Sequence, residues 1–305
     1  METGILFLQN LRKTYGNKTA VNIAALEIQP HTFTCIVGKS GCGKTTLLRL
    51  LAGLETPDSD TYIKANESGS GSTISNRNDL INAAKGNISS CITGLPAKTA
   101  PVFQEPRLMP WLTVKENIMF SLKGSKGDPR HSEPERRKTS EPLTVAQRNN
   151  PKQLKQGANP INTDAALTSP EDRCEQLLQE LELTEAANLY PAQLSGGMAQ
   201  RVSLGRTLFY DPELILMDEP FSALDYFTRR NLQDMVLRLF QYQKKTILFV
   251  THDVEEALLL GDRILVMENG SIKADMPVTL PFPRQASDSS LQEMRQQILN
   301  LLSDN

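Results

Sequence analysis

One short segment, Gly38–Thr46, restricts the fold of this chain more than any other part of the sequence. It reads Gly-Lys-Ser-Gly-Cys-Gly-Lys-Thr-Thr and fits the pattern G-x-x-x-x-G-K-[ST] of a phosphate-binding loop. Residues 32–37 have the composition of a short apolar strand, and residues 45–54 have that of a helix with a leucine-rich face. Because the motif needs a strand before it and a helix after it, this context predicts an α/β protein that binds a nucleotide.

The chemistry of this loop follows from its glycines and its lysine. Glycines let the backbone turn on a small radius, so that N–H groups point at phosphate oxygens, and the following helix start favours an anion. Lys44 is expected to reach the β- and γ-phosphates, and the Thr45 hydroxyl to ligate Mg²⁺. The expected nucleotide contacts are Gly38, Lys39, Ser40, Gly41, Cys42, Gly43, Lys44, Thr45 and Thr46.

Composition excludes some classes of protein. The formal net charge of −2 argues against a chain that binds nucleic acid through its overall charge. The four cysteines lack the spacing of a zinc site or a disulfide framework, which fits a reducing compartment. Residues 1–4 do not begin a signal peptide, and no apolar run is long enough to span a membrane, so we expect any membrane association to come through a partner.

Strand-like and helix-like segments alternate along the chain. Residues 5–11 and 19–28 are expected to form an antiparallel unit, and the apolar runs 214–217, 246–250 and 264–267 read as buried strands. Buried strands that alternate with helices predict a mainly parallel sheet with helices on both faces.

Two polar tracts interrupt this pattern, at residues 58–99 and 123–170. Both are expected to be flexible insertions, because they offer little apolar surface to offset the entropy of ordering the backbone. We expect one domain over residues 1–305, with a helical region at about 105–210 and a helical tail at 278–305.

The second tract is basic between residues 123 and 155, where nine Lys or Arg face four Asp or Glu. Within it, the run Arg136-Arg137-Lys138 could bind nucleic acid or anionic lipid. We expect it instead to belong to a solvated surface insertion, with binding to nucleic acid or anionic lipid as the alternative.

An acidic pair, Asp218 and Glu219, follows the buried strand 214–217. Because the carboxyl ends of parallel strands meet at one edge of the sheet, this pair should emerge beside the phosphate-binding loop. Asp218 is then placed to hold Mg²⁺, and Glu219 to polarise the water that attacks the γ-phosphate. The alternative is a solvated acidic pair at a strand end.

A further glycine pair lies in Leu194–Arg201, directly before a predicted helix. It makes a second anion-binding helix start, and one γ-phosphate does not need two such sites in one chain. Two chains packed head to tail do need them, because each can offer this segment to the nucleotide of the other.

Five motifs together resemble an ABC-type ATPase, and they occur in the order of that family. They are the loop Gly38–Thr46, Leu-Ser-Gly-Gly at 194–197, Asp-Glu at 218–219, Ser-Ala-Leu-Asp at 222–225 and Thr-His-Asp at 251–253. The resemblance covers the chain apart from the two polar tracts. It implies a P-loop ATPase with a mainly parallel core sheet, an antiparallel β subdomain and an inserted helical subdomain, which binds ATP and Mg²⁺.

The resemblance also assigns residues to the nucleotide. Tyr15 looks like the aromatic residue that stacks on adenine, although it could instead simply cap the opening hairpin. Gln104 looks like the residue that touches Mg²⁺ and water and senses the membrane partner. His252 looks like the residue that contacts the γ-phosphate and helps to hold Glu219 and its water.

Other assigned residues concern the second chain. Ser195, Gly196 and Gly197 would bind the partner's nucleotide, and Asp225 would connect the two protomers near the γ-phosphates. The sequence departs from the usual family pattern at Met198, where Gln is common. The backbone donors and the helix start are unaffected by that change, so we expect activity to persist.

Two segments point to a narrower group within the family. Residues 104–114 and the tail that begins at residue 280 resemble the ATPase subunits of nitrate, sulfonate, taurine and bicarbonate importers. Leu108, Met109 and Trp111 form a short apolar cluster that could receive a helix of a permease. They could also pack inside the helical subdomain.

The resemblance implies an ATP-hydrolysing importer subunit for a small anion or sulfonate, at the cytoplasmic face of the plasma (inner) membrane. Its expected partners are permease subunits, a second ATPase subunit and, indirectly, an extracytoplasmic substrate-binding protein, with no nucleic acid. The alternative is a soluble ABC-type ATPase that acts on nucleic acid or ribosomes, for which the basic tract is the main support. A regulatory ATP-binding protein that barely hydrolyses ATP and a simple kinase explain the motifs less well.

Overall fold

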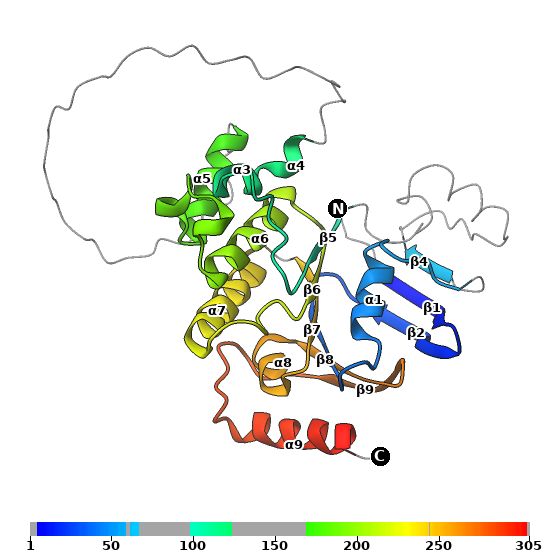
Figure 1. The fold of residues 1–305 in the computed structure, drawn as a ribbon. Coiled ribbons are helices and arrows are strands. Elements are labelled where there is room, and N and C mark those ends of the chain that lie inside the picture. Colours follow the sequence, from blue (N-terminus) through cyan, green and yellow to red (C-terminus); the bar gives the residue numbers. More distant parts are fainter. Residues whose placement is uncertain (1–4, 59–61, 67–97, 124–168, 244, 304–305) are drawn as a thin grey trace, which may run out of the picture.

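The computed structural model describes residues 5–58, 62–66, 98–123, 169–243 and 245–303. In these ranges the chain forms two sheets and the helices that surround them (Figure 1). A small sheet lies beside the first helix, a larger sheet occupies the centre, and a group of helices lies at the top of the view.

The central sheet is mainly parallel, as the apolar runs predict. Every neighbouring pair of strands is parallel except the last, which is antiparallel. Its strands, in spatial order, are β5 (Thr99–Val102), β6 (Leu214–Asp218), β7 (Thr246–Thr251), β3 (Phe33–Val37), β8 (Arg263–Glu268) and β9 (Ser271–Pro277).

The small sheet is antiparallel and has the order β2, β1, β4, with β1 at Ile5–Tyr15 and β2 at Lys18–Ile28. The expected antiparallel unit is therefore present. The expectation that a polar tract begins at residue 58 is wrong at its start, because Tyr62–Asn66 forms β4. This segment contains Tyr, Ile and Ala among its five residues, and its backbone groups pair with the edge of β1 that β2 leaves open. Residues 67–97 lie outside the described ranges.

Both faces of the central sheet are buried, which explains its unbroken apolar runs. In β7, Ile247 and Phe249 belong to one core with helices that include α5 (Pro170–Glu180), α6 (Gly196–Tyr210), α7 (Tyr226–Gln243), α8 (Val254–Leu260) and α9 (Ser289–Ser303). Their neighbours Leu248 and Val250 belong to a second core with α1 (Lys44–Leu51) and the small sheet. Alternate residues of one strand thus stabilise two layers, as expected for a parallel sheet covered on both sides.

Between β5 and β6 the described residues form the short helices α3 (Val114–Ile118) and α4 (Phe120–Lys123) and the longer helices α5 (Pro170–Glu180) and α6 (Gly196–Tyr210). Thr113 caps α3 with Glu116 in a reciprocal capping box, and Ser169 caps α5. Nearly all of the tract expected at 123–170 lies outside the described residues. The helices are α1 (Lys44–Leu51), α3 (Val114–Ile118), α4 (Phe120–Lys123), α5 (Pro170–Glu180), α6 (Gly196–Tyr210), α7 (Tyr226–Gln243), α8 (Val254–Leu260) and α9 (Ser289–Ser303), with 3₁₀ turns at Thr184–Ala186 and Pro191–Gln193.

A buried arginine, Arg284, fastens the tail to the body of the protein. Its guanidinium donates hydrogen bonds to the backbone carbonyls of Leu258, Gly261, Val278 and Leu280. Burial lowers the pKa of this guanidinium below its ordinary value. The anchor holds the segment that leads into α9, which packs on the core below α8 (Figure 1).

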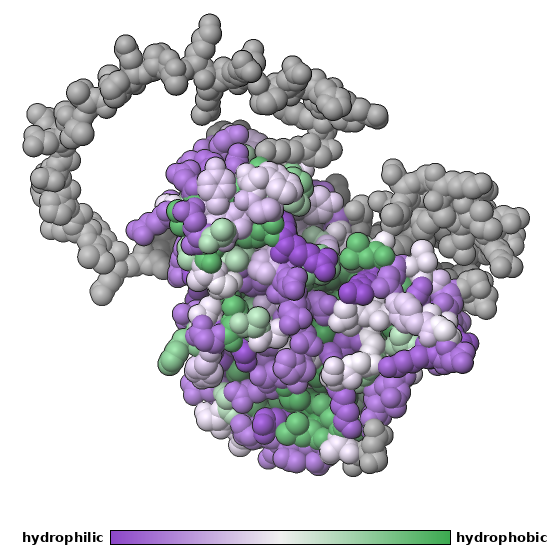
Figure 2. All heavy atoms as spheres, viewed as in Figure 1, coloured by the Kyte–Doolittle hydropathy of each residue, from purple (hydrophilic) through white to green (hydrophobic). Residues whose placement is uncertain are grey.

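The face of the molecule drawn in Figure 2 is largely polar, with small apolar patches between polar side chains. No helix in the described ranges combines the length and the apolar character that crossing a membrane requires.

Candidate nucleotide-binding and hydrolysis site

Three neighbouring strands bring the predicted chemical groups to one edge of the central sheet. β7 lies between β3 and β6, and all three run in the same direction. The phosphate-binding loop follows β3, Glu219 follows β6, and His252 follows β7. Since parallel strands end at the same edge, segments that are far apart in sequence meet there.

The loop before α1 depends on Gly43. Its φ of 109° lies in the left-handed region, and an added Cβ would lie 2.0 Å from the carbonyl oxygen of Ala20. The Lys44 side chain is buried under the loop, where its Nζ donates to the carbonyls of Gly38 at 2.7 Å and Lys39 at 3.1 Å. The cation is therefore held inside the turn that is expected to cradle phosphate.

An open pocket of about 290 Å³ lies over this loop. Glu219 and Tyr15 both line it, so the structure brings them together with six of the nine expected loop residues. The Tyr15 hydroxyl donates a hydrogen bond to Glu55. Of the other loop residues, Cys42 packs in the second core. The pocket is lined by Tyr15, Lys18, Ala20, Ser40, Gly41, Gly43, Lys44, Thr45, Thr46 and Glu219.

Thr45 and Asp218 place two oxygen atoms beside the loop. The Thr45 Oγ1 donates to the Asp218 Oδ1 at 3.0 Å. Burial raises the pKa of Asp218, although the hydrogen bond from Thr45 opposes that shift. Hydroxyl and carboxylate oxygens are hard donors of the kind that Mg²⁺ prefers, and Mg²⁺ commonly adds phosphate oxygens to one or two carboxylates. The residues present therefore fit this ion.

Glu219 and His252 form a pair at the rim of the pocket. The His252 Nδ1 lies 2.8 Å from the Glu219 Oε2, and the two side chains are 60% and 24% exposed. Glu219 has a φ of 44°, which is uncommon for a residue other than glycine, and its N–H donates to Val250 at 2.9 Å. Such strain costs on the order of 1 kcal/mol and is frequent at functional sites.

The second glycine segment lies at the start of α6, next to the start of α7. Ser195 caps α6 by accepting from the Met198 N–H at 3.2 Å. Gly197 is buried against α7, where an added Cβ would lie 2.4 Å from the Thr228 Cγ2. Ser195, Gly196 and Gly197 are not among the residues that line the pocket over the phosphate-binding loop.

Asp225 is exposed and caps α7, because its carboxylate accepts from the N–H groups of Phe227 and Thr228 at 3.1 Å each. Hydrogen bonding from Thr228, first from its side chain and then from its backbone, lowers the pKa of Asp225, with a smaller contribution from the Phe227 N–H. The sequence did not predict this capping role. The exposed rings of Tyr226 and Phe227 follow, in an edge-to-face contact.

Gln104 lies beside the pocket rather than in its lining. Val102 pairs with Met217, so Gln104 follows β5 at the level where Glu219 follows β6. Its side chain is exposed, and the backbone before it is held by Gln200, whose Nε2 donates to the Phe103 carbonyl at 3.2 Å.

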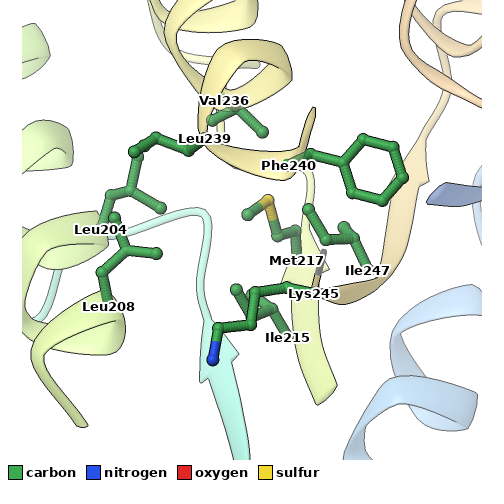
Figure 3. A pocket seen from close by; sticks show the side chains of 9 residues that line it. All are labelled: Leu204, Leu208, Ile215, Met217, Val236, Leu239, Phe240, Lys245 and Ile247. Carbon is green, nitrogen blue, oxygen red and sulfur yellow. The ribbon is translucent and has the colours of Figure 1, made fainter. Parts of the chain in front are cut away.

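A second, much smaller cavity of about 10 Å³ lies behind β6 and β7 (Figure 3). Apolar side chains such as Leu204 and Phe240 surround it, and the Lys245 ammonium pairs with Asp211 at 2.5 Å. A cavity of this size holds at most one water molecule, so it is a packing gap and not a binding site.

Motif reasoning missed three further groups. Arg229, Gln233 and Glu256 hold the segments that carry Glu219 and His252. Residue type carried no signal for Glu256, because it follows Glu255 in the first turn of α8 (Val254–Leu260), where acidic residues commonly favour a helix start.

Known proteins match this chain in sequence over nearly its whole length. The aliphatic sulfonates import ATP-binding protein SsuB of Granulibacter bethesdensis is 34% identical over 301 residues, which cover 99% of this chain and 95% of that protein. The proteins of the same name from Pseudomonas fluorescens and Yersinia pestis are 34% and 35% identical; the matches cover 96% of this chain in each case and 85% and 83% of those proteins.

Solved structures agree with the fold. The dimeric ATP-binding cassette MJ0796, in a post-hydrolysis state with ADP and Pi, has a TM-score of 0.59 and 26% identity over 90% of this chain and all of that chain. The ADP conformation of the cassette MJ1267 has a TM-score of 0.61 at 21% identity over 99% and 95% of the two chains. A family model described as ABC transporter matches residues 21–222. The chain therefore belongs to the ABC transporter family, as one of its ATP-binding, ATP-hydrolysing proteins.

Proposed function

We propose that this ATPase is the energy-supplying subunit of an ABC importer, and that the imported solute is a small anion or sulfonate. The observation that carries the proposal is the match along nearly the full chain to proteins named as aliphatic sulfonate import subunits. The basic tract that favoured a soluble ATPase acting on nucleic acid lies outside the described residues, and none of these relatives is named for such a role.

In this mechanism, Lys44 binds the β- and γ-phosphates, and Tyr15 stacks on the base at the other end of the pocket. Thr45, Asp218 and Gln104 would hold Mg²⁺, which supplies positive charge against the phosphates. Glu219 accepts a proton from the attacking water, and His252 orients the Glu219 carboxylate through the 2.8 Å contact.

A second copy would complete the site. Ser195, Gly196 and Gly197 start α6 in a position outside the chain's own pocket, and their surface would serve the nucleotide of the partner. Asp225 is exposed and lies near this segment, because Gly197 packs against Thr228, whose N–H donates to the Asp225 carboxylate. The dimeric cassette structure to which this chain is similar supports such an arrangement.

The permease would contact the segment that precedes α3. Trp111 is 70% exposed, whereas Leu108 packs against the core. Buried Asn117 shapes this loop, because its side chain hydrogen bonds to the backbone of Met109 at 2.8 and 3.2 Å and of Leu112 at 3.0 Å. A loop held this firmly presents Trp111 as an anchor for a partner, at the cytoplasmic face of the membrane.

Affinity isolation from solubilised membranes, with mass spectrometry of the proteins that co-purify, tests this function. We expect a polytopic permease to co-purify with the native chain, and Trp111→Ala to reduce its recovery severalfold because the anchor is lost. Tyr210→Ala removes another exposed aromatic ring, at the far end of α6, and should leave recovery unchanged. Recovery of ribosomes or DNA without any membrane protein would contradict the importer.

Nucleotide binding can be tested separately. Lys44→Ala should weaken ATP binding by about 10- to 100-fold, because a charge-assisted contact to phosphate contributes about 1.5–3 kcal/mol. Titration with a fluorescent ATP analogue measures this change. Lys273→Ala removes a cation near the tail and serves as the control. Equal affinities of the two variants would disprove the role of Lys44.

A further inference from the structure

A buried carboxylate, that of Glu256, lies directly behind the turn that carries His252. Glu256 is only 6% exposed, and both of its oxygens accept hydrogen bonds. The Gln233 Nε2 donates to Oε1 at 2.8 Å, and the Thr251 Oγ1 donates to Oε2 at 2.5 Å. These three side chains join the end of β7, the start of α8 and the middle of α7.

The hydroxyl of Thr251 pins the His252 turn on both sides. Thr251 is the last residue of β7, and its Oγ1 also accepts from the Asp253 N–H at 3.0 Å. Asp253 in turn caps α8 by accepting from the Glu255 N–H at 2.9 Å. The backbone before and after His252 is thus held, while its ring projects towards Glu219.

The same region of α7 also holds the segment that follows Glu219. Arg229, one helical turn before Gln233, donates to the backbone carbonyls of Phe221 at 3.2 Å and Leu224 at 2.9 Å. The turn with His252 and the segment after Glu219 therefore share one support, α7, which fixes their positions relative to each other.

We propose that Thr251, Glu256 and Gln233 are positioning residues for ATP hydrolysis, which set His252 against Glu219 through their buried hydrogen bonds. This inference rests on the proposed roles of Glu219 and His252. A small displacement of the His252 ring costs catalysis because the reacting groups must be aligned within a fraction of an ångström, whereas nucleotide binding depends on other residues.

The variant Thr251→Val tests the network with little change of volume. We expect its kcat to fall about tenfold, with the KM for ATP within about twofold of the native value. The matched control is Thr207→Val, which removes another buried threonine hydroxyl, bonded to the Ser203 carbonyl at 3.2 Å within α6. A merely structural role would lower thermal stability in both variants and leave kcat, measured well below the unfolding temperature, equal in both.

Combination with His252→Ala shows whether the network acts through His252. If it does, Thr251→Val causes no further loss of kcat in the His252→Ala background. Independent, multiplicative losses would overturn the proposal. The readout depends on the residual turnover of His252→Ala, which single-turnover measurements at high enzyme concentration can follow.

A conservative variant provides rescue if the valine variant folds poorly. Glu256→Gln can still accept from Thr251, and its amide can donate to the Gln233 carbonyl once that side chain flips. We therefore expect it to retain most of the kcat that Glu256→Ala loses. Equal losses in both variants would overturn the proposal.

Failure of the proposed site and failure of the network give different results. If Glu219→Gln and His252→Ala kept full turnover, the proposed hydrolysis site itself would be wrong. If those two variants lost turnover while the Thr251 and Glu256 variants kept it, only the proposed role of the network would be wrong.

Discussion

Replacing Glu219 with glutamine is expected to lower kcat for ATP hydrolysis by about 10²- to 10⁴-fold, the usual contribution of a general base. Glutamine has nearly the same size, so the contact with His252 and the backbone hydrogen bonds of residue 219 can persist. The amide cannot accept a proton from water, however. Steady-state phosphate release gives kcat, and titration with a fluorescent ATP analogue should show nearly native affinity.

The control for this experiment is Glu175→Gln, which neutralises an exposed carboxylate that pairs with Lys115 on the helical region. Its kcat should equal that of the native protein. Turnover of Glu219→Gln near the native rate would mean that another group accepts the proton. Loss of nucleotide affinity together with turnover would instead indicate that Glu219 mainly shapes the pocket.

Replacing Arg284 with alanine is expected to have the largest effect on stability. The change leaves the buried carbonyls of Leu258, Gly261 and Val278 without their donors, and each such loss costs about 1–3 kcal/mol. Unfolding monitored by circular dichroism should therefore begin about 10 °C lower or more, since each kcal/mol corresponds to about 2–4 °C in a chain of 150–250 residues. The pocket lies elsewhere, so ATP binding at low temperature should persist.

Two further variants sharpen this result. Arg284→Lys should recover only part of the stability, because a lysine ammonium cannot reproduce the planar array of donors. Arg238→Ala removes an exposed arginine from α7 and should leave the unfolding temperature nearly unchanged. Equal unfolding temperatures for Arg284→Ala and Arg238→Ala would contradict a stabilising role for the buried guanidinium.

The parts of the fold that could be predicted are those with local signals. The apolar runs at 214–217 and 246–250 identify strands buried on both faces, and the glycine pattern identifies the turn into α1. β4 is a five-residue strand beside a long polar stretch of sequence, and only its backbone pairing with β1 places it in the small sheet. The side-chain network around Glu256 depends on Gln233 and Thr251, which only the packing of α7 on the sheet brings near.

The predicted site likewise contains residues that the sequence could place and residues whose assigned roles depend on other molecules. Lys44, Thr45, Asp218 and Glu219 follow strands whose direction and order can be inferred from the sequence, and the structure brings these residues together. Their proposed roles in catalysis and nucleotide binding stay predictions, as do those of the other assigned residues. Ser195 and Asp225 are assigned to a second copy of the chain, and Gln104 to an ion and a membrane partner.

The order of strands in the central sheet has a consequence for the time at which the site forms during synthesis. β3 carries the phosphate-binding loop, yet it pairs with β7, where Val37 lies opposite Thr251, and with β8. Contacts between residues so distant in sequence slow folding, because a long loop must close first. At about 5–20 residues per second, a ribosome needs on the order of 10 to 40 s to make the chain between Val37 and Thr251. The loop is thus synthesised well before β7 and β8, and its strand cannot complete its pairing, or the nucleotide pocket form, until both of these neighbours have been made.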